Sequence, residues 1–184
     1  MTLPSPRRNI ALLAAAQALL LTNGVTLVAI NGLLGMQLAA DKRLATLPIT
    51  TYVIGAALAA LPAALFMKHR GRRAGFMLGA AFGVGGALLS AMAVFTSSFW
   101  LLCLATILAG IYNAFGQQYR FAAVDAAPAD WRGKAISLTL AGGIVGGVVG
   151  PQVGTLTRNL LEPTYLASYA ALAGFAALDR KSVV

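Results

Sequence analysis

Residues 46–95 read TLPITTYVIGAALAALPAALFMKHRGRRAGFMLGAAFGVGGALLSAMAVF, and this stretch decides the fold. Two apolar segments, 46–67 and 74–95, flank a basic cluster at 68–73. Each segment is close to the length of about 20 residues that a helix needs to cross a bilayer core. In lipid the backbone must satisfy its own hydrogen bonds, so both segments are predicted to be helices. Together they predict a transmembrane hairpin with a charged loop.

The same pattern extends outward over the whole chain. Further apolar segments lie at 10–37, 99–121, 135–156 and 164–178, separated by short polar stretches. The first is too long for the apolar core of a signal peptide, which spans about 7–15 residues. We therefore predict an all-α polytopic membrane protein with about six transmembrane helices in a single domain, 1–184. The sixth helix is the shortest of the six.

The composition indicates the same solvent. Apolar residues make up 59% of the chain and charged residues 10%, whereas a soluble domain carries roughly 25% charged residues. The 20 glycines suit close packing of membrane helices. The net charge of +9 sits in short islands between apolar segments, which argues against a nucleic-acid partner. The single cysteine, Cys103, lies in an apolar run and indicates neither a disulfide nor a metal site.

The basic residues predict an orientation. With the N-terminus inside, three of the 14 Lys and Arg residues fall in outer loops, namely Lys42, Arg43 and Arg158, and the other 11 fall in inner segments. This bias follows the positive-inside rule. We expect a multi-pass protein of the cell (inner) membrane with both termini in the cytoplasm.

The loop between the second and third segments carries a first motif, Gly71-Arg72-Arg73, followed by Gly75. Glycine permits a tight turn, and the arginines stay in water while they anchor the helix ends. A plain positive-inside loop would account for the same charges.

A second motif, Gly146-x-x-x-Gly150-Pro151-x-x-Gly154, lies in the fifth segment. Proline removes a backbone hydrogen bond and kinks a helix, and the glycines let a neighbouring helix approach closely. The motif therefore predicts a place where a packed helix bends. A packing motif without any conformational role is the alternative.

Polar stripes run along two of the predicted helices. In 99–121, spacings of three and four residues place one set on a single face: Thr106, Gly110, Asn113, Gln117 and Arg120. In 10–37 a smaller set recurs every seven residues with one neighbour beside it: Gln17, Gly24 and Asn31, with Asn23. A polar face on a membrane helix meets water, a solute or another helix. The stripes predict a substrate path or, alternatively, interhelical hydrogen bonds.

Asp125 lies in the polar linker after the fourth segment, together with Arg132 and Lys134. The functional interpretation is a gating ion pair between Asp125 and Arg132 or a proton-linked carboxylate, and the alternative is a solvated loop charge. The middle of each predicted helix lacks Asp and Glu, so these helices predict no carboxylate proton relay. The sequence also lacks a catalytic cluster, a metal-ligand cluster and a cofactor fingerprint, so we expect neither an enzyme nor a cofactor.

The loop motif, the glycine-proline motif and the helix count together resemble the N-terminal six-helix half of transporters of the major facilitator superfamily. The sequence departs from the family pattern at Lys68, where an acidic residue is usual, at Ala64, where a glycine is usual, and at Thr106, where an arginine is frequent. The resemblance implies two nested three-helix repeats. It also implies a cavity lined by the first and fourth helices, and the glycine-proline motif leans towards export.

The resemblance implies secondary active transport of a small organic solute by alternating access. The implied partners are the lipid bilayer, the solute, and a second six-helix half or a second copy of the chain. Because the chain corresponds to one half and stops at Val184 without a linker, we expect a truncated transporter or a half that dimerises. The alternatives are a non-transporting six-helix membrane protein with an assembly or sensor role, and an inactive fragment.

Overall fold

The computed structural model of the protein describes residues 6–157 and 165–182, and in these ranges it contains helices and no strands. The helices are α1 Pro6–Leu38, α2 Leu47–Arg70, α3 Arg72–Phe95, α4 Phe99–Gly116, α5 Tyr119–Ala126, α6 Arg132–Thr157 and α7 Leu166–Ser182. Two 3-10 turns, Lys42–Leu44 and Ala129–Trp131, precede α2 and α6. The predicted all-α class is confirmed.

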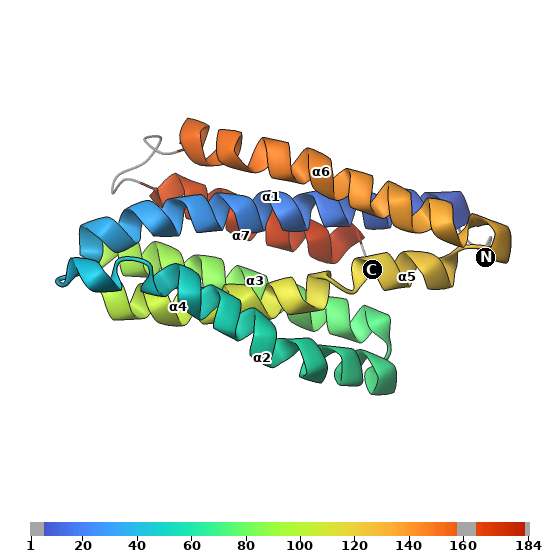
Figure 1. The fold of residues 1–184 in the computed structure, drawn as a ribbon, viewed down its shortest axis with the longest axis horizontal. Helices are drawn as coiled ribbons and strands as arrows, with labels where there is room; N and C mark the ends of the chain where they lie inside the picture. Colours follow the sequence, from blue (N-terminus) through green and yellow to red (C-terminus); the bar gives the residue numbers. More distant parts are fainter. Residues whose placement is uncertain (1–5, 158–164, 183–184) are drawn as a thin grey trace.

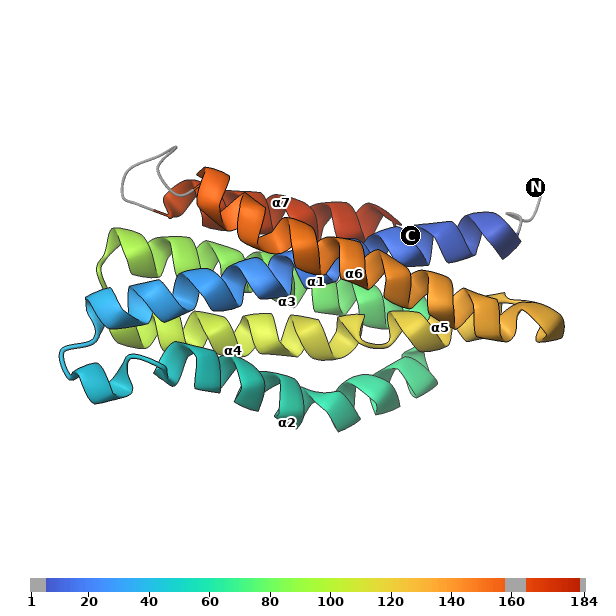
Figure 2. The same cartoon turned by 45° about the horizontal axis from the view of Figure 1, so that its top comes forward.

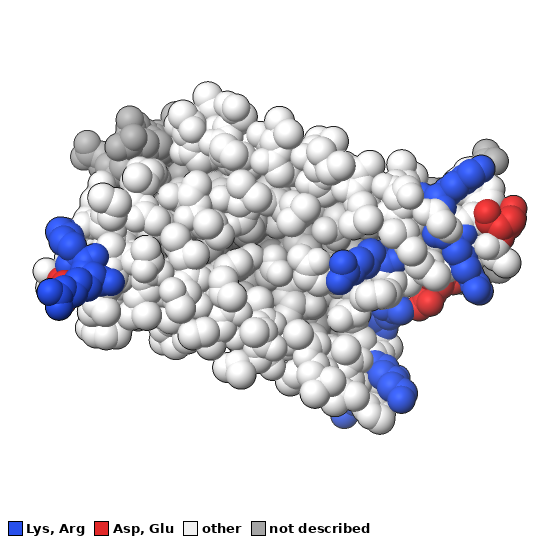
Figure 3. Space-filling view, in the orientation of Figure 1, with Lys and Arg blue, Asp and Glu red and all other residues white. Residues whose placement is uncertain are grey.

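The long helices have the dimensions and surface of membrane spans. Five stretches are long and apolar enough to cross a bilayer: Arg8–Leu38, Lys42–Arg70, Arg72–Phe95, Phe99–Ala126 and Ala129–Thr157. The sixth predicted helix corresponds to α7, whose apolar part is the shorter Ala167–Ala176. On the face shown in Figure 3, Lys and Arg gather towards the two ends of the molecule and leave a broad band without charged side chains between them. Such a band suits a hydrocarbon environment.

The helix ends differ from the predicted ones where the chain becomes polar. α2 continues to Arg70 and α3 begins at Arg72, so the predicted loop 68–73 shrinks to Gly71. Gly71 has φ +86°, a conformation that glycine adopts without strain. After α4 the helix is interrupted at residues 117–118, and the chain then forms α5. Asp125 therefore lies in α5 and not in a loop. Hydropathy locates only the apolar part of a helix. The hydrogen-bonded helical backbone continues beyond that part into the polar residues that follow.

The helices form two close pairs. α1 lies along α6, and α2 lies along α4. Figure 2 shows these four helices side by side, with α3 and α7 behind them, and Figure 1 shows the same layers from another side. α3 packs on α4 and on α7, and α7 also packs on α1. Exchanging α1 with α4, α2 with α6, and α3 with α7 maps these pairings onto one another, as two three-helix repeats require.

Glycines allow both close pairs to form. A Cβ on Gly146 of α6 would lie 2.1 Å from the carbonyl oxygen of Ala18 in α1. A Cβ on Gly110 of α4 would lie 2.2 Å from the carbonyl oxygen of Tyr52 in α2. Lipid is as apolar as a leucine side chain, so membrane helices associate through such close van der Waals contact. The four helices α1, α2, α4 and α6 are called the front layer. These two interfaces hold α1 to α6 and α2 to α4 within it.

Candidate functional site

A polar cluster lies where α1, α2 and α4 meet. Tyr52 of α2 hydrogen-bonds to Asn113 of α4, and Gln117 Nε2 donates to Asn113 Oδ1 at 3.4 Å. Gly24 of α1 closes the third side, because a Cβ built on it would lie 3.1 Å from Tyr52 Oη and 3.7 Å from Asn113 Nδ2. Tyr52, Asn113 and Gln117, here called the phenol–amide cluster, are all half-buried. Part of each side chain therefore remains accessible from outside the bundle.

The sequence pattern found two members of this cluster and missed the third. Asn113 and Gln117 belong to the predicted stripe on the fourth segment, whereas Tyr52 was not singled out. The available signal was a polar run, Thr50-Thr51-Tyr52, inside an apolar segment. A run of consecutive residues points in several directions around a helix, so it does not indicate which member faces the neighbouring helix.

Towards the start of α2 the same pair of helices carries a hydroxyl contact. Thr51 Oγ1 and Thr106 Oγ1 lie 2.7 Å apart, and Thr106 also donates to the carbonyl oxygen of Cys103 at 2.8 Å. Thr106 is fully buried. The first residue of the predicted stripe on α4 is therefore part of an interhelical contact with α2.

The predicted polar residues of α1 are buried away from the phenol–amide cluster. Asn23 Nδ2 donates to the carbonyl oxygen of Leu172 in α7 at 3.0 Å, and Asn31 Oδ1 accepts from the hydroxyl of Tyr169. Gln17 is buried against α6. α1 has α2, α4, α5, α6 and α7 around it, so residues on one of its faces meet different neighbours. These contacts are of the kind that the interhelical alternative predicts.

Arg120, the last member of the predicted stripe, also lies outside the cluster. The break at 117–118 ends α4, and Arg120 belongs to α5, where it is exposed. Its guanidinium carbon lies 5.0 Å from the centroid of the Phe121 ring. A single continuous face through residues 106–120 therefore does not exist.

The glycine-proline motif of α6 lies against α1. Its glycines Gly146, Gly150 and Gly154 are buried, and Pro151 is exposed inside a continuous helix. The nearest α1 atoms would lie 2.1, 3.0 and 3.5 Å from a Cβ on these three glycines in turn. Thr22 Oγ1 donates to the carbonyl oxygen of Gly146 at 3.2 Å, and Thr26 Oγ1 donates to that of Gly150 at 2.6 Å. The interface is tightest at Gly146 and relaxes towards Gly154.

Asp125 forms an ion pair, but with a different arginine from the predicted one. Arg72 Nε donates to Asp125 Oδ2 at 2.8 Å, and Arg72 Nη2 contacts the same oxygen. Arg132 begins α6 instead, and the ion pair found among the described residues does not include it. The helical continuation of residues 119–126 brings Asp125 beside the first residue of α3. With Lys68 and Gln118 the pair lines a cavity of about 330 Å³.

The loop motif around Gly71 therefore contributes one side chain to a contact between helices. Arg72 joins α3 to α5, whereas Arg73 is exposed. The side chains of the ion pair are 35% and 61% exposed, and such exposed pairs contribute about 0.2–1 kcal/mol. The contact is weak enough to break and re-form.

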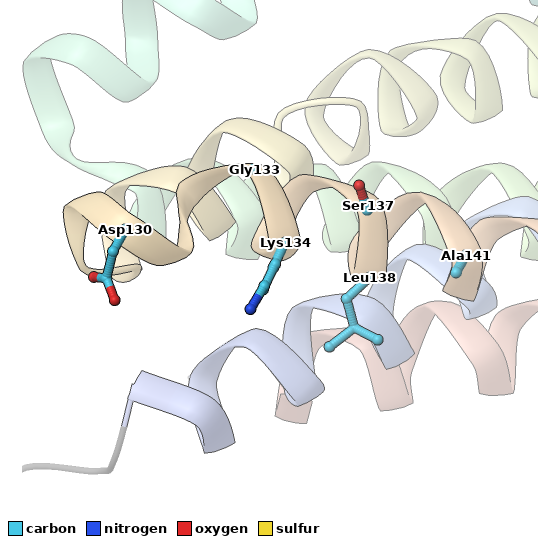
Figure 4. A pocket seen from close by; sticks show the side chains of 6 residues that line it. All are labelled: Asp130, Gly133, Lys134, Ser137, Leu138 and Ala141. Atoms are coloured by element: carbon cyan, nitrogen blue, oxygen red, sulfur yellow. The ribbon is translucent and has the colours of Figure 1, made fainter.

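A wider groove lies on the first turns of α6 (Figure 4). It has a volume of about 650 Å³ and is lined by Asp130, Gly133, Lys134, Ser137, Leu138 and Ala141. Lys134 and Leu138 point the same way from the helix, and Lys134 Nζ lies 5.1 Å from the centroid of the Trp131 ring. The groove is open and its lining comes from a single stretch of chain, so it does not enclose a ligand.

Comparison with known proteins supplies the family. The family model for the Major Facilitator Superfamily matches residues 11–178. The riboflavin transporter RfnT of Brucella anthropi is 42% identical over 161 residues, which cover 88% of this chain and 40% of that protein. The uncharacterized MFS-type transporter YdeG of Bacillus subtilis is 30% identical over 113 residues, covering 61% of this chain and 26% of that protein. The chain spans less than half the length of these relatives. It belongs to the major facilitator superfamily.

Proposed function

We propose that this chain forms one half of a secondary transporter that moves a small, neutral, flavin-like solute across the cell membrane by alternating access. The observation that carries the proposal is the 42% identity, over 88% of this chain, to a protein named as a riboflavin transporter. The phenol–amide cluster supports it, because the cluster offers hydrogen bonds at membrane depth where α4, one of the two helices expected to line a cavity, meets α2 and α1.

The charge distribution supports a neutral solute. Charged side chains are absent from the apolar stretches 9–40, 44–67, 74–118 and 135–157. An ion taken out of water into such surroundings needs a partner charge or pays a large desolvation free energy. A neutral solute with several polar groups needs only hydrogen bonds, which the cluster supplies.

The exposed faces of α2 and α6 support a second six-helix unit as partner. Leu58 and Leu61 on α2 are 73% and 68% exposed, and Ile144 and Val148 on α6 are 71% and 67% exposed. The two helices flank α4 and α1 in the front layer (Figure 2). We propose that a second half, or a second copy of this chain, covers this layer and completes the cavity.

Two contacts are the proposed moving parts. The Arg72–Asp125 pair lies at the end of the bundle that carries α5, and it is exposed enough to break during a change of state. The motif Gly146, Gly150, Pro151 and Gly154 is the place where α6 bends while it stays packed on α1. With the positive-inside orientation, the ion pair lies on the cytoplasmic side, as do both termini.

Uptake of radiolabelled riboflavin into proteoliposomes tests the proposal. Vesicles that contain the chain are expected to accumulate label faster than protein-free vesicles. Gly146→Leu is expected to abolish the difference because the added side chain meets the backbone of α1, whereas Ile144→Leu, on the exposed face of the same helix, is expected to retain it. Equal flux in the presence and absence of correctly folded chain would reject riboflavin transport by this protein.

The number of copies is measured separately. Native mass spectrometry of the chain released from lipid nanodiscs distinguishes one copy from two. A defined dimer is expected if two copies complete the cavity. A strictly monomeric chain that nevertheless transports riboflavin would refute the need for a second unit.

A further inference from the structure

We infer that Tyr52, Asn113 and Gln117 form a recognition site for the imide edge of a neutral planar heterocycle, the edge at which one N–H lies between two carbonyl groups. The inference rests on the proposed function and deepens it, because it names the side chains that distinguish the solute. It also gives a role to Tyr52 of α2, which the predicted polar stripes did not include.

Two hydrogen bonds orient the amide of Asn113. Gln117 Nε2 donates to Asn113 Oδ1, so this oxygen points along α4 towards Gln117. The amide nitrogen then points to the other side, where Asn113 Nδ2 and Tyr52 Oη lie 3.7 and 3.1 Å from the position that a Cβ on Gly24 would take. The hydrogen bond between Tyr52 and Asn113 therefore runs from Nδ2 to the phenol oxygen.

This orientation leaves a specific set of hydrogen-bonding groups for a ligand. The Tyr52 hydroxyl keeps its proton as a donor, and Gln117 keeps Oε1 as an acceptor. The amides of Asn113 and Gln117 each retain a second N–H donor. An imide presents an acceptor, a donor and another acceptor. The Gln117 amide offers an acceptor and a donor side by side for one half of that edge, and Tyr52 and Asn113 offer further donors. Side-chain amides read nucleobase edges by the same pairing of one donor with one acceptor.

The surroundings of the cluster select against charged ligands of the same shape. α2 from Leu47 to Met67 and α4 throughout contain no charged side chain, so neither helix offers a partner charge to a carboxylate or phosphate at this depth. Half-burial of all three cluster residues excludes part of the water that would otherwise compete for the hydrogen bonds. Recognition is thus expected to depend on neutral donors and acceptors.

Binding of two flavins to the chain in lipid nanodiscs tests the inference. The probes are riboflavin and 3-methylriboflavin, in which a methyl group replaces the imide proton. Quenching of flavin fluorescence reports the dissociation constant. The wild-type chain is expected to bind riboflavin about tenfold more tightly than the methylated probe, which corresponds to one lost hydrogen bond with an unpaired acceptor.

Variants locate that discrimination on the cluster. Gln117→Leu removes the acceptor for the imide proton, so it is expected to weaken riboflavin binding and to bring the two dissociation constants together. Tyr52→Phe keeps the ring and removes one donor, so it is expected to weaken both probes several-fold. The matched control is Thr50→Val, which removes an exposed hydroxyl of α2 that bonds within its own helix to the carbonyl oxygen of Thr46 at 3.2 Å. Circular dichroism and elution volume establish that each variant is folded.

The outcomes separate the inference from the proposed function. Loss of discrimination in Gln117→Leu, with Thr50→Val unchanged, supports the inference. If both cluster variants bind riboflavin as tightly as the wild-type chain and still discriminate against the methylated probe, the inference is overturned and riboflavin transport stands. Failure of the wild-type chain to bind riboflavin overturns both. If Gln117→Leu does not fold, the response of Tyr52→Phe decides, because that change preserves volume.

Discussion

Replacing Gly146 with alanine is expected to separate α1 from α6 and to destabilise the bundle. The added Cβ would lie 2.1 Å from the carbonyl oxygen of Ala18, 2.9 Å from the carbonyl carbon of Ala18 and 3.0 Å from the backbone nitrogen of Thr22. These are backbone atoms, so no change of rotamer relieves the contact. Ordinary contact begins at 3.4 Å, so α1 must move by about 1.3 Å, and overpacking of this kind costs about 1–3 kcal/mol.

Gly147→Ala provides the matched control for this substitution. Gly147 follows Gly146 in α6, and a Cβ on it meets nothing within 4 Å. Both substitutions gain the same helix propensity, about 1 kcal/mol, so the difference between them isolates the contact with α1. Gly154→Ala, whose Cβ would lie 3.5 Å from Thr26 Cγ2, is expected to behave like the control.

Reversible unfolding in mixed micelles, followed by circular dichroism as the fraction of SDS rises, measures the effect. The free energy of unfolding of Gly146→Ala is expected to lie about 1–3 kcal/mol below that of Gly147→Ala. Equal free energies for the two variants would refute the close packing of α1 on α6 at this position. A loss shared equally by all three alanine variants would point instead to a general requirement for glycine in α6.

Three further predictions concern other contacts. Thr26→Val loses the hydrogen bond to the carbonyl oxygen of Gly150 and is expected to lower the free energy of unfolding by about 0.5–1.5 kcal/mol, whereas Thr155→Val, an exposed residue bonded within its own helix, changes it little. A double-mutant cycle of Arg72→Ala and Asp125→Ala is expected to give a coupling of about 0.2–1 kcal/mol that shrinks at high salt; a coupling that salt does not alter would contradict the exposed geometry. Cys103 is buried and is expected to react with maleimide after SDS unfolding but not in intact membranes, and rapid labelling of the native chain would contradict its placement.

The helices could be predicted from the sequence because lipid imposes a simple rule on it. Every segment that crosses the membrane must be apolar and long, and those two properties are visible without a structure. The helix ends were harder to place. The basic cluster at 68–73 reads as a loop, yet Lys68 and Arg70 still belong to α2. Their side chains favour water, but nothing in them prevents the backbone from remaining helical.

The candidate site was only partly predictable, because the polarity of a residue does not show which helix its side chain will contact. Asn113 and Asn31 are both amides on polar stripes of membrane helices. Asn113 faces the junction of α1 and α2, whereas Asn31 is fully buried beside Tyr169 of α7. Which of the two remains accessible depends on how α1 is surrounded. Likewise, the partner of Asp125 depends on the helical path of residues 119–126. The positions of charged residues in the sequence do not reveal that path.

The packing suggests why the polar cluster lies where it does. Within each close pair, glycine brings backbone against backbone, as at Gly146 and Ala18, so the two helices move together. Between the pairs, α1 meets α2 and α4 at Gly24 through the ends of two side chains, those of Tyr52 and Asn113. Side-chain ends adjust more readily than backbone atoms. A rocking motion of one pair against the other is therefore expected to change the phenol–amide cluster before it disturbs either pair. Under the proposed function, this couples occupancy of the cluster to the movement that alternating access requires.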